Sequence, residues 1–223
     1  MVERPSLALV STSRAVVEVD QGTVPRWMHQ ALPHVFAMDF QRNALDGWEM
    51  VRVAYELEAH AIHARRPAVQ RRFRAFADGV LAKRLGRAYV FGTGPSLERA
   101  RDRSFGDGYV VVCNTIVRDA DMWAHLRPDF IAAGDAIYHF GHTEHARAFR
   151  RDLGARLRES AGATMFVYPE LFDPIVRREL GDLESQLAPL PFDSHADVTR
   201  SLLRRPVLPS SSNVLNILLL PLG

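Results

Sequence analysis

The sequence predicts an α/β protein: a mostly parallel sheet with helices on both faces, preceded by a mainly helical N-terminal segment. After Gly86, short and nearly uninterrupted apolar stretches alternate with helical stretches, which is typical of parallel strands that are covered on both faces. Before Gly86, long stretches with apolar residues at helical spacing dominate. We therefore divide the 223 residues into an N-terminal segment, 1–86, and a Rossmann-like domain, 87–223.

The N-terminal segment predicts short strands and two helices. The stretches LALV (7–10) and AVVEV (15–19) alternate as strands do. Residues 45–65 form an amphipathic pattern, which predicts a first helix. A second helix is expected from Pro67, a residue suited to a first helical turn, to a C-terminal cap at Gly86.

Strands and helices then alternate along the second segment. The predicted strands span 87–92, 108–114, 128–135 and 163–170. Residues 171–209 contain several prolines and predict only a mixed helical stretch, whereas the tail SSSNVLNILLLPLG (210–223) predicts an apolar helix with serines at its N-terminal cap. Because such a helix needs cover and a doubly wound sheet would continue with a strand, we expect further strands beyond Gly223 and interpret the sequence as a fragment.

The stretch GTGPSL, directly after the first of these strands, is the strongest functional signal. Gly92 and Gly94 permit positive φ and carry no β-carbon that would hold a ligand away from the backbone. Pro95 suits the first helical turn, and the N–H groups of Ser96 and Leu97 would point out of a helix N-terminus, which suits phosphate. The residues alone leave two interpretations open, a phosphate-binding loop and an ordinary tight turn.

Polar residues follow the next strands, at the sheet edge where ligands of α/β proteins gather. Asn114 could bind a base or ribose, or simply close the turn. Asp135 could bind a ribose hydroxyl or a metal-bound phosphate, or cap the next helix. The serines at 210–212 bring hydroxyl and N–H groups to a second helix N-terminus, which suits phosphate or serves as an N-cap.

Other features favour structural roles. His139, His142 and His145 are three residues apart, but we favour a solvated helix start over a metal site. The basic cluster at 65–74 is interpreted as a solvated helix face. The single cysteine, Cys113, excludes an internal disulfide and is expected to be a small buried side chain.

Composition bears on whether the protein binds nucleic acid, spans a membrane or is secreted. The 28 basic and 26 acidic residues leave a net charge of +2, which does not favour a nucleic-acid partner. The last apolar stretch is shorter than the roughly 20 residues that a membrane span needs. The N-terminus lacks a signal-peptide pattern, so we expect a cytoplasmic protein.

In this order, GTGPSL (92–97), Asn114, the stretch PDFIAAGD (128–135) and the serine-led tail resemble the MptE-like family, named for 6-hydroxymethylpterin diphosphokinase. That family includes a domain of the motility accessory factors that glycosylate flagellin. The resemblance covers residues 87–223. More distantly the chain resembles bacterial sialyltransferases, but Thr93 stands where these usually have asparagine, and PDFIAAGD favours the MptE-like side.

The resemblance implies a nucleotide-dependent transferase. The expected nucleotide-binding residues are Gly92, Thr93, Gly94, Pro95, Ser96, Asn114, Asp135, Ser210, Ser211 and Ser212. ATP would lie across the switch point of the sheet, Mg²⁺ held through Asp135 would offset charge, and a hydroxymethylpterin-like alcohol would accept a diphosphate. The alternatives are a glycosyltransferase that uses a CMP-sugar and a glycan acceptor, and a non-catalytic nucleotide-binding module. The resemblance names no catalytic base in this chain.

Overall fold

The computed structural model describes most of the chain outside the N-terminal region. The described residues are 16–18, 24–32, 35–37, 48–83, 86–141, 143–193, 201–209 and 218–223. Near the N-terminus, the strands β1 (Val16–Glu18) and β2 (Val35–Ala37) pair in parallel, with α2 (Arg26–Ala31) between them in the sequence. The first of these lies within the predicted strand 15–19, whereas residues 7–10 lie outside the described residues.

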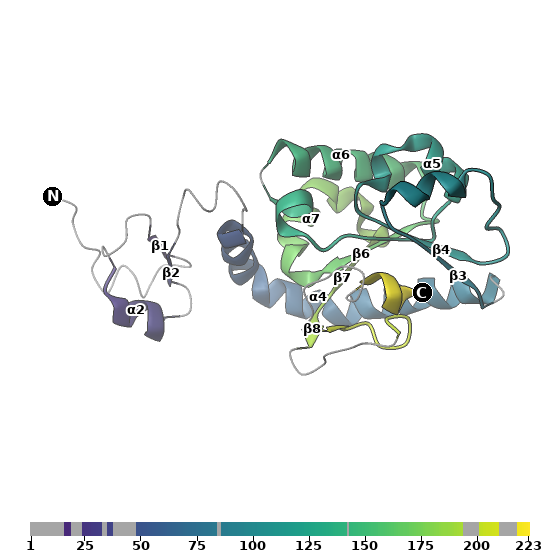
Figure 1. Cartoon of the computed structure of the whole chain (residues 1–223). Helices are drawn as coiled ribbons and strands as arrows, with labels where there is room; N and C mark the ends of the chain where they lie inside the picture. Colours follow the sequence, from purple (N-terminus) through teal and green to yellow (C-terminus); the bar gives the residue numbers. More distant parts are fainter. Residues whose placement is uncertain are drawn as a thin grey trace.

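A single long helix, α4 (Trp48–Lys83), stands where two helices were expected to meet at Pro67. The prediction of a break was wrong, although a proline inside a helix removes one backbone hydrogen bond and crowds the preceding turn. The buried side chains of Ile62 and Val69 anchor the helix on either side of Pro67. In Figure 1 the ribbon of α4 changes direction part-way along its length, as expected of a helix with an internal proline.

A five-stranded, fully parallel sheet forms the centre of the molecule. Its strands, in spatial order, are β3 (Ala88–Phe91), β4 (Tyr109–Cys113), β5 (Phe130–Ala132), β6 (Met165–Pro169) and β7 (Leu187–Leu190). The first four confirm the predicted strands. The sequence pattern missed β7, because Pro189 interrupts a short stretch and proline is uncommon inside strands.

Helical segments connect these strands. They are η1 (Pro95–Ala100), η2 (Asn114–Arg118), α5 (Ala120–Leu126), η3 (Ala136–Phe140), α6 (Glu144–Glu159), η4 (Glu170–Phe172), α7 (Asp173–Leu180) and η5 (Gly181–Gln186). Three of these segments begin at side-chain caps: Asp119 accepts a hydrogen bond from the N–H of Met122, Asp135 from that of Tyr138, and Thr143 from that of Ala146.

Helices lie on both faces of the sheet (Figure 1). The strands alternate their side chains between two apolar layers. Val110 and Val112 face the layer that α5, α6 and α7 cover. Val111 faces the opposite layer, where Phe73 of α4 and Leu218 near the C-terminus pack. The expectation of helices on both faces is therefore confirmed.

The described strands lie across the sheet in their sequence order. Along the chain, each of β4 to β7 lies beside its predecessor, so every crossover advances in the same direction. Crossovers of one hand that advance in one direction place their helices on the same face, which is where α5, α6 and α7 lie. A switch point needs a reversal of this order, and the described strands contain none.

The C-terminal residues pack on the first two strands of the sheet. After the short pair β8 (Phe192–Asp193) and β9 (Leu208–Pro209), the chain ends in α8 (Leu220–Leu222). The Tyr109 hydroxyl of β4 donates to the carbonyl oxygens of Leu222 and Gly223, at 3.0 and 2.7 Å. In the described part of the chain, no helix has the length and apolar character to cross a bilayer.

Candidate functional site

The loop after β3 leaves its backbone exposed at the carboxyl edge of the sheet. Gly92, Thr93 and Gly94 are all exposed. Neither glycine has a positive φ, and Gly94 is extended, with φ −76° and ψ 167°. A β-carbon added at either glycine would meet no atom of the described residues within 4 Å. Neither backbone conformation nor close packing therefore requires glycine at these two positions.

The helical turn after this loop differs from the one expected. Pro95–Ala100 is a 3₁₀ helix, whose hydrogen bonds join residues three apart. The N–H of Leu97 consequently donates to the carbonyl of Gly94 at 3.0 Å, so the expectation that it is free for phosphate was wrong. Ser96 is exposed, and within the described part of the chain neither its N–H nor its hydroxyl has a partner. Ser96 thus offers two donors beside the open glycines.

Cys113, the last residue of β4, joins the loop to the neighbouring strand. Its thiol accepts a hydrogen bond from the backbone N–H of Thr93. The side chain is buried, and burial raises the pKa of the thiol to about 11. A protonated, buried thiol is a poor nucleophile, and its place in the core confirms the expected packing role.

Asn114, the next residue, combines two unusual features. Its φ is +52°, a left-handed conformation that is uncommon for a residue with a side chain. Its Oδ1 atom is buried and has no hydrogen-bond partner among the described residues. Strained backbone and an unused buried acceptor are both features that gather at binding sites.

Asp135 follows β5 and caps the π-helical turn η3. Its Oδ1 accepts from the backbone N–H of Tyr138 at 2.9 Å, so the capping role is present in the structure. The residue is nevertheless exposed. Because β3, β4 and β5 are neighbours in a parallel sheet, the Gly92–Ser96 loop, Asn114 and Asp135 all follow strands that end at the same edge.

The structure describes two of the three histidines, His139 and His145, and their surroundings differ. His139 is buried against Phe149, accepts a hydrogen bond from the N–H of Asp135 at Nδ1, and has its pKa lowered to about 4 by burial. His145 instead contacts Tyr138 and Arg118. His142 and the serines at 210–212 lie outside the described residues. Among the residues that are described, no group of three His, Cys, Asp or Glu could hold a metal ion.

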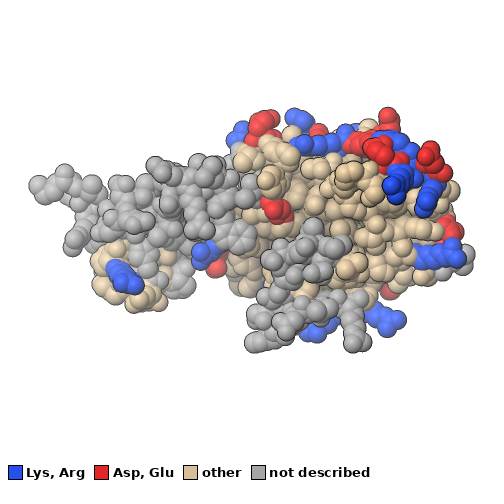
Figure 2. Space-filling model, viewed as in Figure 1, with Lys and Arg blue, Asp and Glu red and all other residues tan. Residues whose placement is uncertain are grey.

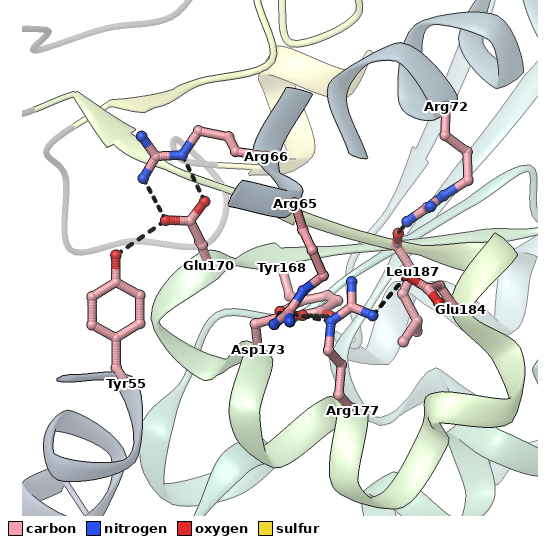
Figure 3. A network of polar contacts seen from close by, with 10 residues as sticks. All are labelled: Tyr55, Arg65, Arg66, Arg72, Tyr168, Glu170, Asp173, Arg177, Glu184 and Leu187. Carbon is pink, nitrogen blue, oxygen red and sulfur yellow. Dashed lines mark hydrogen bonds and ion pairs between the residues drawn. The ribbon is translucent and has the colours of Figure 1, made fainter. Parts of the chain in front are cut away.

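A second polar group at the end of β6 was missed by the sequence reasoning (Figure 3). The buried carboxylate of Glu170 accepts two hydrogen bonds from Arg66, at 2.6 and 2.9 Å, and one from the hydroxyl of Tyr55. Burial, together with the interaction with Glu170, raises the pKa of Tyr55 to about 12. These residues join α4 to the segment that follows β6.

Asp173 forms the second half of this group. Its carboxylate, 1% exposed, accepts hydrogen bonds from Tyr168, Arg177 and Arg65. The Nη2 of Arg72 also turns inward and donates to the carbonyl of Leu187. For these arginines the interpretation of 65–74 as a solvated helix face was wrong, since buried carboxylates more than 100 residues away bind Arg65 and Arg66.

A groove of about 390 Å³, which Phe91 and Ser96 help to line, reaches this edge of the sheet. On the face shown in Figure 2, acidic and basic side chains are mixed along α5 and α6. A cleft of about 590 Å³ lies among residues 101–106 and 124–127, which precede β4 and β5 and so lie toward the opposite edge of the sheet. The candidate site comprises exposed backbone and polar groups at strand ends, beside the groove.

Comparisons with models of known protein families, with curated proteins and with solved structures gave no match for this chain. The MptE-like resemblance thus stays a prediction from the sequence motifs.

Proposed function

We propose that the chain is a nucleotide-dependent transferase that binds a nucleotide phosphate at Gly92–Ser96. One observation carries this proposal: Gly92 and Gly94, on either side of Thr93, are exposed glycines that neither their φ angles nor any atom of the described residues requires. The remaining physical reason for glycine is close approach of a ligand to the backbone. The unpartnered donors of Ser96 match the acceptor oxygens of a phosphate.

The neighbouring strand ends extend this site. Asn114 offers a buried acceptor atom, which suits an N–H of a base or a ribose hydroxyl. Asp135 keeps one carboxylate oxygen outside its cap hydrogen bond. A nucleotide whose phosphates lie on the loop would thus have base or ribose partners at β4 and β5, which are the next strands in the sheet.

The donor set is compatible with Mg²⁺ held mainly by the nucleotide. This ion is commonly bound by one or two carboxylates together with substrate phosphates and water, and Asp135 is an exposed carboxylate at the proposed site. Bound there, Mg²⁺ would neutralise charge that develops on the phosphate oxygens. Asp135 would hold the ion, and the loop would hold the phosphates.

Diphosphate transfer is the reaction we assign. The oxygen of a hydroxymethylpterin-like alcohol forms a bond to the β-phosphorus of ATP, while the bond from that phosphorus to the oxygen bridging the α-phosphate breaks. AMP leaves, and the proton of the alcohol passes to solvent or to a base. Release of AMP distinguishes this reaction from simple phosphorylation, which releases ADP.

A panel of nucleotides tests the proposal. We expect ATP with Mg²⁺ to raise the melting temperature, and Gly94→Asp to abolish that shift because a carboxylate would repel phosphate at the open position. Gly79→Asp is the matched control, since Gly79 on α4 also has open space around it. A response to CMP or a CMP-sugar alone would reassign the chemistry to sugar transfer.

Two outcomes separate binding from catalysis. Binding of ATP without AMP release in the presence of 6-hydroxymethylpterin would leave a non-catalytic nucleotide-binding module. No shift with ATP, CMP, CMP-sugars or UDP-sugars, or equal shifts for Gly94→Asp and the parent chain, would refute phosphate binding at the loop.

A further inference from the structure

The cleft at the opposite edge of the sheet from the glycine loop has the size of a small-molecule site. Its volume is about 590 Å³, and it lies between residues 101–106, which follow η1, and residues 124–127, at the end of α5. The buried side chains of Val110 and Leu126 form an apolar part of its lining. A concavity of this volume that combines apolar surface with a few polar groups is typical of sites for small ligands.

The two walls of this cleft are joined by hydrogen bonds. The Nε2 atom of His125, on α5, lies 2.9 Å from the carbonyl oxygens of both Ala100 and Arg103. Because both partners are acceptors, this nitrogen carries a proton and donates it to them. The ring of Phe105 packs edge-on against His125, with 6.3 Å between the ring centroids. The spacing between the walls is therefore set by the fold.

Unpaired positive charge lines the cleft on both walls. Arg101 is already paired with two carboxylates, at 2.7 and 2.6 Å. Arg103 and Arg127 are exposed, and no carboxylate of the described residues forms an ion pair or hydrogen bond with either guanidinium group. Among the described residues that line the cleft, Asp102 is the one carboxylate, so positive charge is in excess. The cleft therefore favours an anionic ligand.

The backbone of Arg127 has an uncommon conformation for arginine. Its φ is +47° and its ψ is 61°, in the left-handed region, at the residue that ends α5. Glycine is the usual residue at such a helix end, because a β-carbon makes this conformation unfavourable. The N–H of Arg127 donates to the carbonyl of Trp123, a hydrogen bond that glycine would also form. The backbone thus gives no reason for arginine here, and residues held in unfavourable conformations gather at functional sites.

We propose that this cleft binds a small organic phosphate, with the phosphate group between Arg103 and Arg127. Guanidinium groups bind phosphate through paired N–H donors. The hydroxyl of Ser104, which also lines the cleft and has no partner among the described residues, adds a donor. Two guanidinium groups and a hydroxyl serve three phosphate oxygens, whereas a carboxylate has only two oxygens. The site lies at the other edge of the sheet from the glycine loop and does not rest on the proposed function.

Calorimetric titration at low salt tests the cleft in the Gly94→Asp variant, whose glycine loop is closed to phosphate. Phenyl phosphate should bind at least about tenfold more tightly than benzyl alcohol, which has the ring without the charge. Arg103→Gln should weaken phenyl phosphate about tenfold, because charge-assisted hydrogen bonds are lost. Arg151→Gln is the matched control, since Arg151 is 71% exposed on α6 and does not line the cleft, and should leave the affinity unchanged.

Arg127→Gly separates a binding role from a structural one. It relieves the left-handed conformation and should raise the melting temperature, yet weaken phenyl phosphate about tenfold. A lower melting temperature, as expected if Arg127 only interacts with the dipole at the end of α5, would contradict its assignment to the site. Benzoate that binds as tightly as phenyl phosphate would overturn the choice of phosphate. No binding of phenyl phosphate, or affinities that Arg103→Gln and Arg127→Gly leave unchanged, would overturn the site itself.

Discussion

At the residue scale, the most informative positions are Gly92 and Gly94, after β3, because no described atom packs against them. Glycine is selected in folded chains for positive φ, for tight packing or for access to the backbone. The structure removes the first two reasons at Gly92 and Gly94. The sequence could suggest all three, but only φ angles and the surrounding space can separate them.

His139 makes a pH-dependent contribution at the same scale. Burial lowers its pKa to about 4 from an unfolded value of about 6.5, so the unfolded chain binds more protons between these values. Stability should therefore fall as the pH drops below 6.5, with a loss of roughly 2 kcal/mol by pH 4.5 from this group. Urea unfolding at pH 7.5 and 4.5 should show a smaller loss for His139→Gln. An equal loss in both proteins would contradict this account.

At the element scale, the attachment of α4 depends on contacts that no local pattern reveals. Its arginines look solvated in the sequence because their partners, Glu170 and Asp173, lie more than 100 residues away. Pro67 likewise suggests a helix end, but contacts on both sides keep the helix continuous. Strands β3 to β6 were predictable from their apolar stretches, whereas β7 was hidden by its proline.

Asp173 and Arg65, which are hydrogen-bonded to each other, should contribute unequally to the free energy of unfolding. Asp173→Ala would leave Arg177 and Tyr168 without their buried acceptor and should destabilise the fold by about 3 kcal/mol or more. Arg65→Ala removes a side chain that is 33% exposed and should cost about 1 kcal/mol or less. Chemical denaturation measures both free energies of unfolding. Equal losses would show that Asp173 is not the centre of the network.

At the scale of the whole molecule, periodicity predicted the layers but not the winding of the sheet. Apolar strands between helices indicate a covered parallel sheet, and the structure has one. The order of the strands across the sheet depends on contacts between helices and strands far apart in the sequence. The apolar pattern of the sequence therefore did not predict that β3 to β7 lie in sequence order. The described loop residues still lie at the carboxyl edge, because Gly92 and Asn114 directly follow β3 and β4, and Asp135 follows shortly after β5.

The proposed function depends on binding of nucleotide phosphate at the exposed backbone of Gly94. Calorimetric titration of ATP with Mg²⁺ into the parent chain and into Gly94→Ala tests it most directly. Alanine fits the φ and ψ of Gly94 and meets no neighbour, so the variant should be as stable as the parent or about 0.5 kcal/mol more stable. We expect it to bind ATP at least tenfold more weakly, because its methyl group lies where the phosphate approaches. Equal affinity of the two proteins, or no binding by either, would contradict the account.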